Sequence, residues 1–474
     1  MTVDLFLDGV PARQRSAALY EQLHTAIAHG RFAAGDRLPT TRSLADELGI
    51  ARSTIATVYA RLVAEGHALG RVGDGTFVGP TTATVRAASP VPAPFARAVR
   101  QTGRSVADLE SPPRGWLADL RSGRPDPALF PLTDWRQSVT STLHLPPPGY
   151  DHPAGLPELR RAIAAWIKRS RGVDATADHV LVTAGAQGAF DLCAHTIVGP
   201  DDAVAVEDPG YRLARASFAA RGARIVAVPV DSDGIVVDHI PAHARVIVVT
   251  PSHQAPTGAL LSPDRRRQLL QRAGELDAIV IEDDYDTEYR YVDRPLEPLH
   301  RLDTSGRTVY VGSFSKTISP SLRLGFLVAP PRVVDALADA RRVVDAQPPH
   351  LTQAALAAFI TNGAFERHLR RTRRAYRERR DLLVARLAGM ADDGSISAFA
   401  PCQAGLHTTV SLPDGIDAED LARRLHVAGV AIATTADDQL DNRPSDLVIG
   451  FGLADGNRLT VALDLISATL STLR

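Results

Sequence analysis

One stretch of sequence decides how most of this chain folds: Gly312-Ser-Phe-Ser-Lys316-Thr-Ile-Ser-Pro-Ser-Leu-Arg323-Leu-Gly325. Lys316 is one of only two lysines in the chain, the other being Lys168, so nearly all of the 53 basic residues are arginines. An amine differs from a guanidinium because it can lose its proton when desolvated and then condense with an aldehyde. The retained amine therefore indicates Schiff-base chemistry at this position.

Donors suited to a phosphate group surround this lysine. The hydroxyls of Ser313 and Ser315 precede it, and the Arg323 guanidinium follows it. Such groups bind phosphate through charge-assisted hydrogen bonds. An amine beside a phosphate site is typical of pyridoxal 5'-phosphate (PLP) chemistry. Taken alone, the stretch is more typical of a surface lysine in a serine-rich loop, but further segments favour the cofactor.

Length and composition narrow the class of protein. A chain of 474 residues exceeds one hydrophobic core, so we expect at least two domains. The 53 basic and 54 acidic residues balance, so any nucleic-acid site must be a local patch. Cys193 and Cys402 are too few for a disulfide framework, and no cysteine and histidine spacing indicates a metal site. Without a signal sequence or a long apolar run, the chain is predicted to be soluble and cytoplasmic.

The N-terminal residues predict three helices followed by a hairpin. Leucine and isoleucine recur at helical spacing from Ser16 up to Gly30. Thr40 or Thr41 is expected to cap a second helix that ends at Gly49, and Ser53 a third that ends at Gly66. Residues 67–78 predict two strands around Gly73-Asp-Gly75. This order is typical of a helix-turn-helix with a wing.

The segments Leu38-Pro-Thr-Thr-Arg42-Ser-Leu-Ala, Arg52-Ser-Thr-Ile and Gly75-Thr-Phe-Val resemble the winged helix-turn-helix domain of the GntR superfamily. The resemblance implies binding to double-stranded DNA at its major groove and at the adjacent backbone. The residues it implicates at the groove are Arg42, Arg52, Ser53 and Thr54, and those on the wing are Arg71 and Gly73. A three-helix module that binds protein is the alternative.

Residues 81–113 predict a linker between two domains. They are rich in alanine, threonine and proline, with scattered arginine and no sustained helical or alternating pattern. The predicted organisation is therefore a DNA-binding domain over residues 1–80, this linker, and a large domain over residues 114–474.

The large domain is predicted to be α/β with a mostly parallel sheet. Short runs rich in valine and isoleucine alternate with helical segments, which favours strands covered by helices on both faces. Ligands of such sheets gather at the carboxyl ends of the strands. The predicted strands are 179–183, 203–207, 224–229, 245–250, 278–283, 308–312 and 324–329.

Residues with suggestive chemistry follow these strands. Thr183-Ala-Gly-Ala-Gln187 opens a helix whose backbone N–H groups could receive a phosphate, although glycine-rich turns of this kind are common. Asp283, in Glu-Asp-Asp-Tyr285, could hold a protonated pyridine nitrogen, although a helix cap is the alternative. Tyr211 could stack on a flat ring, or it could be an ordinary core tyrosine.

Together these segments resemble the fold-type I aminotransferases from about residue 120 to residue 474. The resemblance implies that Lys316 forms the internal aldimine with PLP, that Asp283 pairs with the pyridine nitrogen, and that Tyr285 donates to the ring oxygen. It implies that Tyr211 stacks on the ring. The phosphate ligands it implies are Ala186, Gln187, Ser313, Ser315, Arg323 and, from the neighbouring subunit of a homodimer, Tyr150.

The chain departs from the aminotransferase pattern at two places. Ala255-Pro-Thr-Gly258 stands where these enzymes usually read Asn-Pro-Thr-Gly, so the asparagine that contacts the ring oxygen is missing; His253 or Gln254 could replace it. Leu447-Val-Ile-Gly-Phe451 stands where an arginine usually binds the substrate carboxylate. These departures disfavour ordinary transamination of amino acids.

A run of arginines lies between residues 368 and 380. It is most typical of the solvated face of a helix, and a second DNA-contacting surface is the alternative. The run contains Arg370, Arg371, Arg373, Arg374, Arg377, Arg379 and Arg380.

A GntR-like head joined to an aminotransferase-like domain resembles the MocR-type transcriptional regulators. The resemblance implies a homodimeric regulator that senses PLP or its adduct with an amine or amino acid, with vitamin B6 or amino-compound genes as targets. It implies an aminotransferase fold used for sensing and not as an enzyme, with a single half-transamination still open. A working aminotransferase with an accessory head is the alternative, and a third is a DNA-binding protein whose C-terminal domain carries no cofactor.

Overall fold

The computed structural model describes residues 11, 15–28, 31–71, 74–79, 116–143, 149–291, 296–400, 402–441 and 443–473. The described residues form two compact units, one within residues 1–101 and the other within residues 102–474. Each unit has its own hydrophobic core. The predicted linker, residues 81–113, lies outside the described residues, so its boundaries stay a prediction.

The N-terminal unit contains three helices and one hairpin. Leu19, Leu23 and Ile27 are buried on the first helix, as their spacing predicted. Thr40 caps the second helix by accepting a hydrogen bond from the Ser43 N–H at 3.1 Å, and Gly49 ends it in the left-handed conformation. The elements are α1 (Arg15–Ala28), α2 (Thr41–Leu48), α3 (Arg52–Ala64), β1 (Ala68–Arg71) and β2 (Gly75–Val78).

One predicted cap in this unit is wrong. Helix α3 begins at Arg52, and its N-cap is Ala51, whose extended backbone starts the helix without a side-chain hydrogen bond. Ser53 is therefore inside the first turn. Its side chain is exposed, at the end of the helix that a helix-turn-helix presents to DNA.

A sheet of eight strands forms the centre of the C-terminal unit. Five neighbouring strands, from β10 to β6, are parallel, whereas β11 and β7 run antiparallel to their neighbours. All seven predicted strands are present within two residues of their predicted ends. In spatial order the strands are β4 (Val180–Thr183), β11 (Gly325–Val328), β10 (Thr308–Ser313), β9 (Ile279–Asp284), β8 (Ala244–Val249), β5 (Ala203–Asp208), β6 (Arg224–Asp231) and β7 (Gly234–Ile235).

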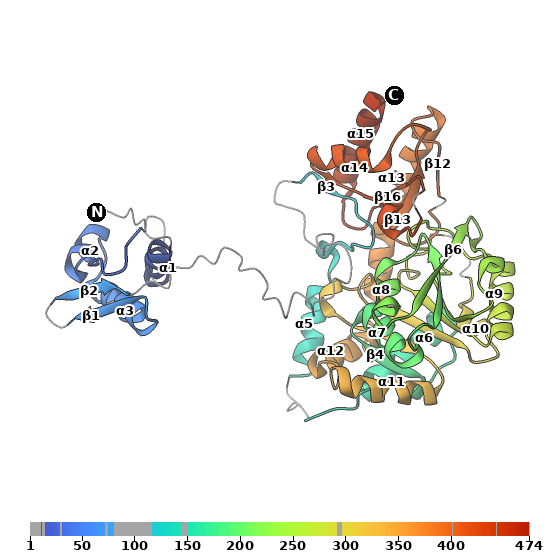
Figure 1. The fold of residues 1–474 in the computed structure, drawn as a ribbon, viewed down its shortest axis with the longest axis horizontal. Helices are drawn as coiled ribbons and strands as arrows, with labels where there is room; N and C mark the ends of the chain where they lie inside the picture. Colours follow the sequence, from blue (N-terminus) through green and yellow to red (C-terminus); the bar gives the residue numbers. More distant parts are fainter. Residues whose placement is uncertain are drawn as a thin grey trace. The chain divides into compact units, whose positions relative to one another are not determined.

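Helices cover both faces of this sheet, which explains why its strands read as continuous apolar runs (Figure 1). Successive strand residues alternate between the two faces: Ile281 packs with one helix layer and Val280 with the other. One layer contains α7 (Gly185–Ile197), α8 (Arg212–Ala220) and α11 (Pro331–Val344). The other contains α6 (Pro157–Arg171), α9 (Pro263–Leu276), α10 (Leu299–Leu302) and α12 (His350–Thr361), against which α5 (Leu132–Thr140) packs.

The rest of the C-terminal unit forms a smaller layer. Its core joins apolar residues of two small sheets and three helices. The four-stranded sheet has the order β12 (Ala398–Phe399), β13 (His407–Ser411), β16 (Leu447–Gly450) and β15 (Ala433–Thr434). β14 (Val430–Ala431) pairs with β3 (Ala118–Asp119), and the helices are α13 (Ala364–Asp392), α14 (Ala418–Val427) and α15 (Gly456–Leu473).

The arginine run lies on α13 and is partly solvated, so the prediction of a solvated face is confirmed for some of its members only. Arg371 donates to the carbonyl of Leu129 at 2.9 Å, and Arg373 donates to that of Glu288 at 2.8 Å. Arg379 and Arg380 likewise donate to backbone carbonyls, of Gly452 and Cys402. These four arginines fasten the helix to neighbouring segments. Arg370, Arg371, Arg374 and Arg377 are exposed, as predicted, whereas Arg373, Arg379 and Arg380 are half-buried.

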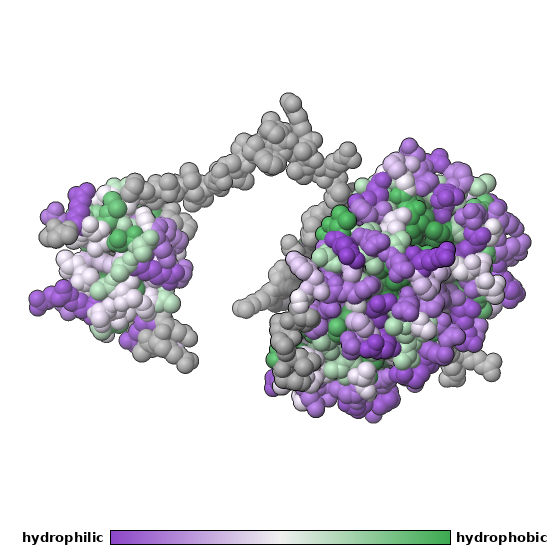
Figure 2. All heavy atoms as spheres, turned by 90° about the horizontal axis from the view of Figure 1, so that it is seen from below, coloured by the Kyte–Doolittle hydropathy of each residue, from purple (hydrophilic) through white to green (hydrophobic). Residues whose placement is uncertain are grey.

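The surface of both units carries hydrophilic and apolar residues. Hydrophilic residues cover most of the face seen in Figure 2, with apolar residues in small groups between them. Among the described residues, the helices include none that is long and apolar enough to cross a membrane.

Candidate functional site

The strand register brings the predicted site residues to one end of the sheet. Ser313, the last residue of β10, pairs with Gly325, which in turn pairs with Thr183 at the end of β4. Asp283 on β9 lies level with Val311 on β10. Lys316, the start of α7 and Asp283 therefore share the carboxyl end of the strands, where ligands of such sheets bind.

Lys316 reaches back to the segment that follows β3. Its Nζ donates to the carbonyl oxygen of Gly123 at 2.7 Å. Gly123 has a φ of +69°, a backbone conformation that favours glycine, and a Cβ there would lie 2.8 Å from that nitrogen. Burial lowers the pKa of the Lys316 ammonium, although the carboxylates of Asp286 and Asp283 oppose the effect. A lowered pKa favours the neutral amine that Schiff-base chemistry requires.

Asp283 is a buried carboxylic acid with an unused oxygen. Among the described residues its Oδ1 has no hydrogen-bond partner. Burial, with the nearby carboxylates of Asp284 and Asp286, raises its pKa well above the usual value. A buried polar atom without a hydrogen-bond partner lowers the stability of the fold. We therefore expect a ligand to supply the missing partner of Asp283. A protonated pyridine nitrogen fits this requirement.

A phosphate-sized donor set lies at the start of α7. Arg323 donates to the carbonyl of Ala184 at 2.8 Å, and its guanidinium lies beside Gly185, the first residue of the helix. The backbone N–H groups of Ala186 and Gln187 belong to the first turn, which attracts anions. The side chain of Gln187 does not point the same way: its Nε2 donates to the Ser217 hydroxyl on α8 at 2.6 Å.

The predicted serine donors meet one another at the end of β10. The Ser313 hydroxyl oxygen accepts the N–H of Ser315 at 3.1 Å, which fixes the turn before Lys316. Ser313 is buried and Ser315 half-buried. Both serines belong to the turn that leads to Lys316, and Arg323 further along the chain has a left-handed backbone with φ 50°.

Tyr211 lies where a ring could stack. It immediately precedes α8 and lines a small cavity together with Phe190, Glu207 and Asp283. Its ring centre is 6.1 Å from that of Phe190. Tyr150 is not brought to this site: 95% of it is exposed in the single chain.

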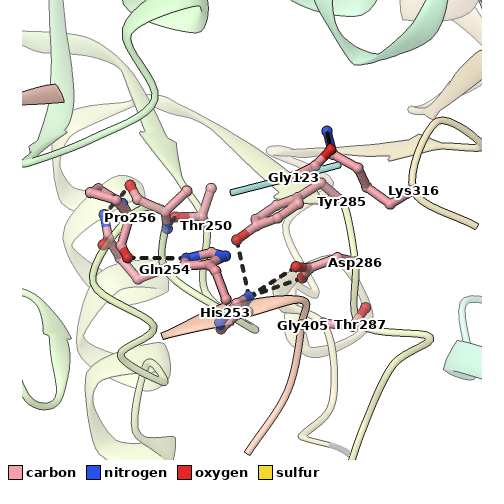
Figure 3. Close-up of polar contacts among 12 residues, drawn as sticks. Gly123, Thr250, His253, Gln254, Pro256, Tyr285, Asp286, Thr287, Lys316 and Gly405 are labelled. Carbon is pink, nitrogen blue, oxygen red and sulfur yellow. Dashed lines mark hydrogen bonds and ion pairs between the residues drawn. The ribbon is translucent and has the colours of Figure 1, made fainter. Parts of the chain in front are cut away.

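The structure separates the two candidates for the missing asparagine. Gln254 is used internally, since its amide nitrogen donates to the carboxylate of Glu207 at 3.1 Å and to the carbonyl of Pro209 at 2.8 Å. His253 instead points toward the site, where its Nδ1 lies 3.0 Å from the Tyr285 hydroxyl (Figure 3). His253 therefore reaches the ring-oxygen side through Tyr285.

Two buried residues beside His253 were missed by the sequence reasoning. Asp286 accepts from the Nδ1 of His253 at 3.0 Å, and the His407 ring lies 4.5 Å from the His253 ring. The second acidic residue in Asp284-Tyr-Asp286 was a visible signal for one of them. His407 had no such signal, because it comes from β13 of the smaller layer.

The strand that lacks the carboxylate-binding arginine is apolar and packed. Val448 and Ile449 of β16 are buried, and the Gly450 N–H donates to the carbonyl of Leu120 at 2.6 Å. Arg121, which follows Leu120, forms an ion pair with Asp119 at 2.8 Å. An arginine in β16 would therefore have to displace core packing.

In the N-terminal unit the predicted DNA contacts gather on α2, α3 and the wing. Arg42, Arg52 and Ser53 are exposed, and Thr54 is half-buried. The Nε of Arg52 donates to the Thr41 hydroxyl at 3.2 Å, which links the starts of α2 and α3. Arg71 lies over the Phe77 ring on the wing at 4.7 Å, whereas Gly73 lies outside the described residues.

Comparison with known proteins supports both the DNA-binding N-terminal unit and the aminotransferase-like C-terminal unit. Residues 15–78 match the family described as bacterial regulatory proteins, gntR family, and residues 120–447 match aminotransferase class I and II. The chain is 39% identical to the probable rhizopine catabolism regulatory protein MocR of Rhizobium meliloti, covering 77% of this chain and 76% of that protein. It is 33% identical to the pyridoxine biosynthesis transcriptional regulator PdxR of Corynebacterium glutamicum, covering 96% of this chain and 95% of that one.

Among solved structures, α-aminoadipate aminotransferase LysN from Thermus thermophilus superposes with a TM-score of 0.71 at 26% identity, covering 80% of this chain and 98% of that one. The head and the site thus define a transcriptional regulator in which a GntR-type DNA-binding domain is joined to an aminotransferase domain. The chain belongs to the MocR-type family of these regulators. The cofactor of its C-terminal domain is PLP, which the unpaired Oδ1 of Asp283 and the half-buried Lys316 fit.

Proposed function

We propose that this chain is a homodimeric transcriptional regulator that senses PLP, or PLP with an amine, through Lys316. The observation that carries the proposal is that Lys316, Asp283 and the start of α7 share one end of the sheet, on a chain that also has a DNA-binding head. When bound, PLP supplies an aldehyde for the lysine and an electron-withdrawing ring. Asp283 would hold the ring nitrogen, Tyr285 its hydroxyl oxygen, and Tyr211 its face. The start of α7, with Ser313, Ser315 and Arg323, would hold the phosphate.

Sensing rather than turnover is supported by the apolar strand β16. A ligand carboxylate would find buried Val448 and Ile449 where aminotransferases usually place an arginine. Binding energy for an amino-acid substrate is therefore reduced, while the cofactor contacts are retained. PLP itself is accordingly the favoured signal, and the relative named as a regulator of pyridoxine biosynthesis supports vitamin B6 genes as targets.

A homodimer is supported by an exposed apolar patch around Tyr150. Asp151 binds His350 at 2.6 Å, which places Tyr150 beside the start of α12. Leu351, which follows His350, is 42% exposed. A partner subunit covering the patch would bury these side chains and bring Tyr150 to the partner's phosphate site.

The proposal is tested by selecting an operator from random DNA and measuring its affinity with and without PLP. We expect the dissociation constant to change when PLP is added to the wild-type chain and to stay constant in Lys316→Ala. A ligand shifts the balance between two conformations only if it binds them with different affinities. An effect of PLP on operator affinity should therefore depend on its capture at Lys316. Equal affinities with and without PLP in the wild-type chain would contradict it.

A working aminotransferase remains the second candidate because Lys316, Asp283 and Tyr285 occupy one site on an aminotransferase fold. The two functions differ in turnover. With an amino donor and a keto acid, the regulator should stop after one half-reaction per chain. Continuous formation of the product amino acid would favour the enzyme.

A further inference from the structure

We propose that Asp286 and His253 form a positioning relay that holds the Tyr285 hydroxyl as a hydrogen-bond donor toward the cofactor, in place of the missing asparagine. The inference deepens the proposed function and rests on PLP binding at Lys316. It concerns residues on three separate segments: the loop after β8, the loop after β9, and, as packing support, β13 (Figure 3).

The contacts of His253 fix the direction of its hydrogen bonds. Both carboxylate oxygens of Asp286 lie near Nδ1, at 3.1 and 3.0 Å, and a carboxylate can only accept. Nδ1 therefore carries the proton. The Tyr285 oxygen lies 3.0 Å from the same nitrogen and can only share that proton as an acceptor. Its own O–H proton is thus left to be donated elsewhere.

Burial and the neighbouring carboxylates keep Tyr285 a phenol. Burial and the carboxylates of Asp286, Asp283, Glu207 and Asp284 raise its pKa well above the usual value. A protonated phenol whose oxygen already accepts from His253 is prepared to donate to an anionic oxygen. This is the contact that the asparagine would otherwise provide.

The packing around His253 holds the ring in one orientation. The ring lies between those of Tyr285, at 5.9 Å, and His407, at 4.5 Å. Gly405 closes the third side, since a Cβ there would lie 2.0 Å from the His253 ring and 2.5 Å from Asp286. A ring held in this way cannot turn its Nδ1 away from Tyr285 without moving the chain.

A metal site is the competing use of the same residues. His253, Asp286 and His407 place one ligand atom each within 4.8 Å of one another, and the buried Nδ1 of His407 has no partner among the described residues. However, His253 Nδ1 already faces three oxygens, two of Asp286 and one of Tyr285. A metal would have to break these hydrogen bonds, so the geometry favours the relay.

The test compares absorbance spectra and PLP dissociation constants of the full-length chain. Loss of the donor in Tyr285→Phe is expected to shift the bound cofactor from its visible band toward its near-ultraviolet band and to weaken PLP binding several-fold. Asp286→Asn and His253→Phe should reproduce both changes. His253→Asn should stay close to the wild type, because the amide nitrogen of asparagine can replace Nδ1 as a donor.

Controls separate the relay from general damage. Asp231→Asn removes a carboxylate that pairs with Arg265 at 2.8 Å outside the site, and it should leave the spectrum unchanged. Melting temperatures of the cofactor-free chains show whether a variant is folded. The pair His253→Asn and His253→Phe keeps the test decisive if Asp286→Asn does not fold.

Three results overturn the inference alone: a wild-type spectrum in both Asp286→Asn and His253→Phe, a wild-type spectrum in Tyr285→Phe, or a bound metal at one per chain that is lost in His407→Ala. A wild-type chain that binds no PLP overturns the proposed function as well.

Discussion

The two units place their functional residues in opposite environments. In the N-terminal unit Arg42, Arg52 and Ser53 are exposed and contribute little to the core. In the C-terminal unit Asp283 is buried, and Tyr285 and Lys316 are half-buried, among other ionisable groups. The DNA-binding surface can therefore change without loss of stability, whereas the cofactor site is maintained at a cost that its ligand offsets.

The largest expected effect follows from removing the amine. Lys316→Ala should abolish covalent capture of PLP completely, since Lys168 lies on the far end of α6 with an exposed side chain paired to Asp174 at 2.7 Å. Mass spectrometry after borohydride reduction measures this directly. Lys168→Ala is the matched control and should gain the same mass as the wild type. Trapping that survives in Lys316→Ala would show that the site has been misplaced.

The next effect tests the cost of the buried site. Asp283→Asn removes a charge-assisted hydrogen bond worth about 1.5–3 kcal/mol, so PLP should dissociate roughly 10- to 150-fold more readily. The same change should raise the melting temperature of the cofactor-free chain, because a buried acid without a partner is removed. Titration with PLP measures the change in affinity, and thermal melting of the cofactor-free chain measures the change in stability.

Glu282→Gln is the control for Asp283→Asn. Glu282 lies on the same strand and is equally buried, but it accepts hydrogen bonds from the N–H groups of Leu299 and His300 on the other face. The PLP affinity of Glu282→Gln should match that of the wild type. Equal loss of affinity in both variants would mean that Asp283 acts through the strand and not through the cofactor.

A smaller effect is expected in the N-terminal unit. Arg52→Ala should weaken operator binding by about 1–3 kcal/mol if Arg52 contacts a base, or lower the salt slope by about one if it contacts a phosphate. Its melting temperature should not change, because the side chain is exposed. Binding measured at several salt concentrations decides between the two. A lowered melting temperature of Arg52→Ala would contradict the view that the DNA-binding residues contribute little to stability.

The smallest effect is a pH dependence of stability. Burial raises the pKa of Glu207 to about 7 from a model-peptide value of 4.5. A raised pKa in the folded state gives stability that is complete below pH 4.5 and is lost as the pH rises to about 7. Glu207→Gln does not titrate, so its melting temperature should gain a few degrees on the wild type across this window. If the melting temperatures of Glu207→Gln and the wild type differed by the same amount at every pH, the raised pKa of Glu207 would be contradicted.

Much of the fold could be read from the sequence because its signals are local. Valine and isoleucine runs marked the strands, and Thr40 and Gly49 marked the ends of α2. The cap at Ser53 was wrong because a serine near a helix start is only one of several ways to begin a helix, and Ala51 begins this one with its backbone alone. Three arginines of α13, Arg373, Arg379 and Arg380, were not recognised as half-buried because their acceptors lie on distant segments.

The site was partly predictable for the same reason. Residues at strand ends, such as Asp283 and Lys316, are brought together by any parallel sheet. The choice between His253 and Gln254 could not be made, because it depends on Glu207 and Asp286 from other strands. His407 belongs to the smaller layer, and its place beside His253 follows only from the tertiary packing.

The most direct test of the account is the affinity of the selected operator for the wild-type and Lys316→Ala chains, each titrated with PLP at fixed salt. Binding of the cofactor in one unit should alter DNA affinity in the wild type and leave Lys316→Ala insensitive. A PLP response of the same size in both chains would contradict the claim that capture at Lys316 is the signal.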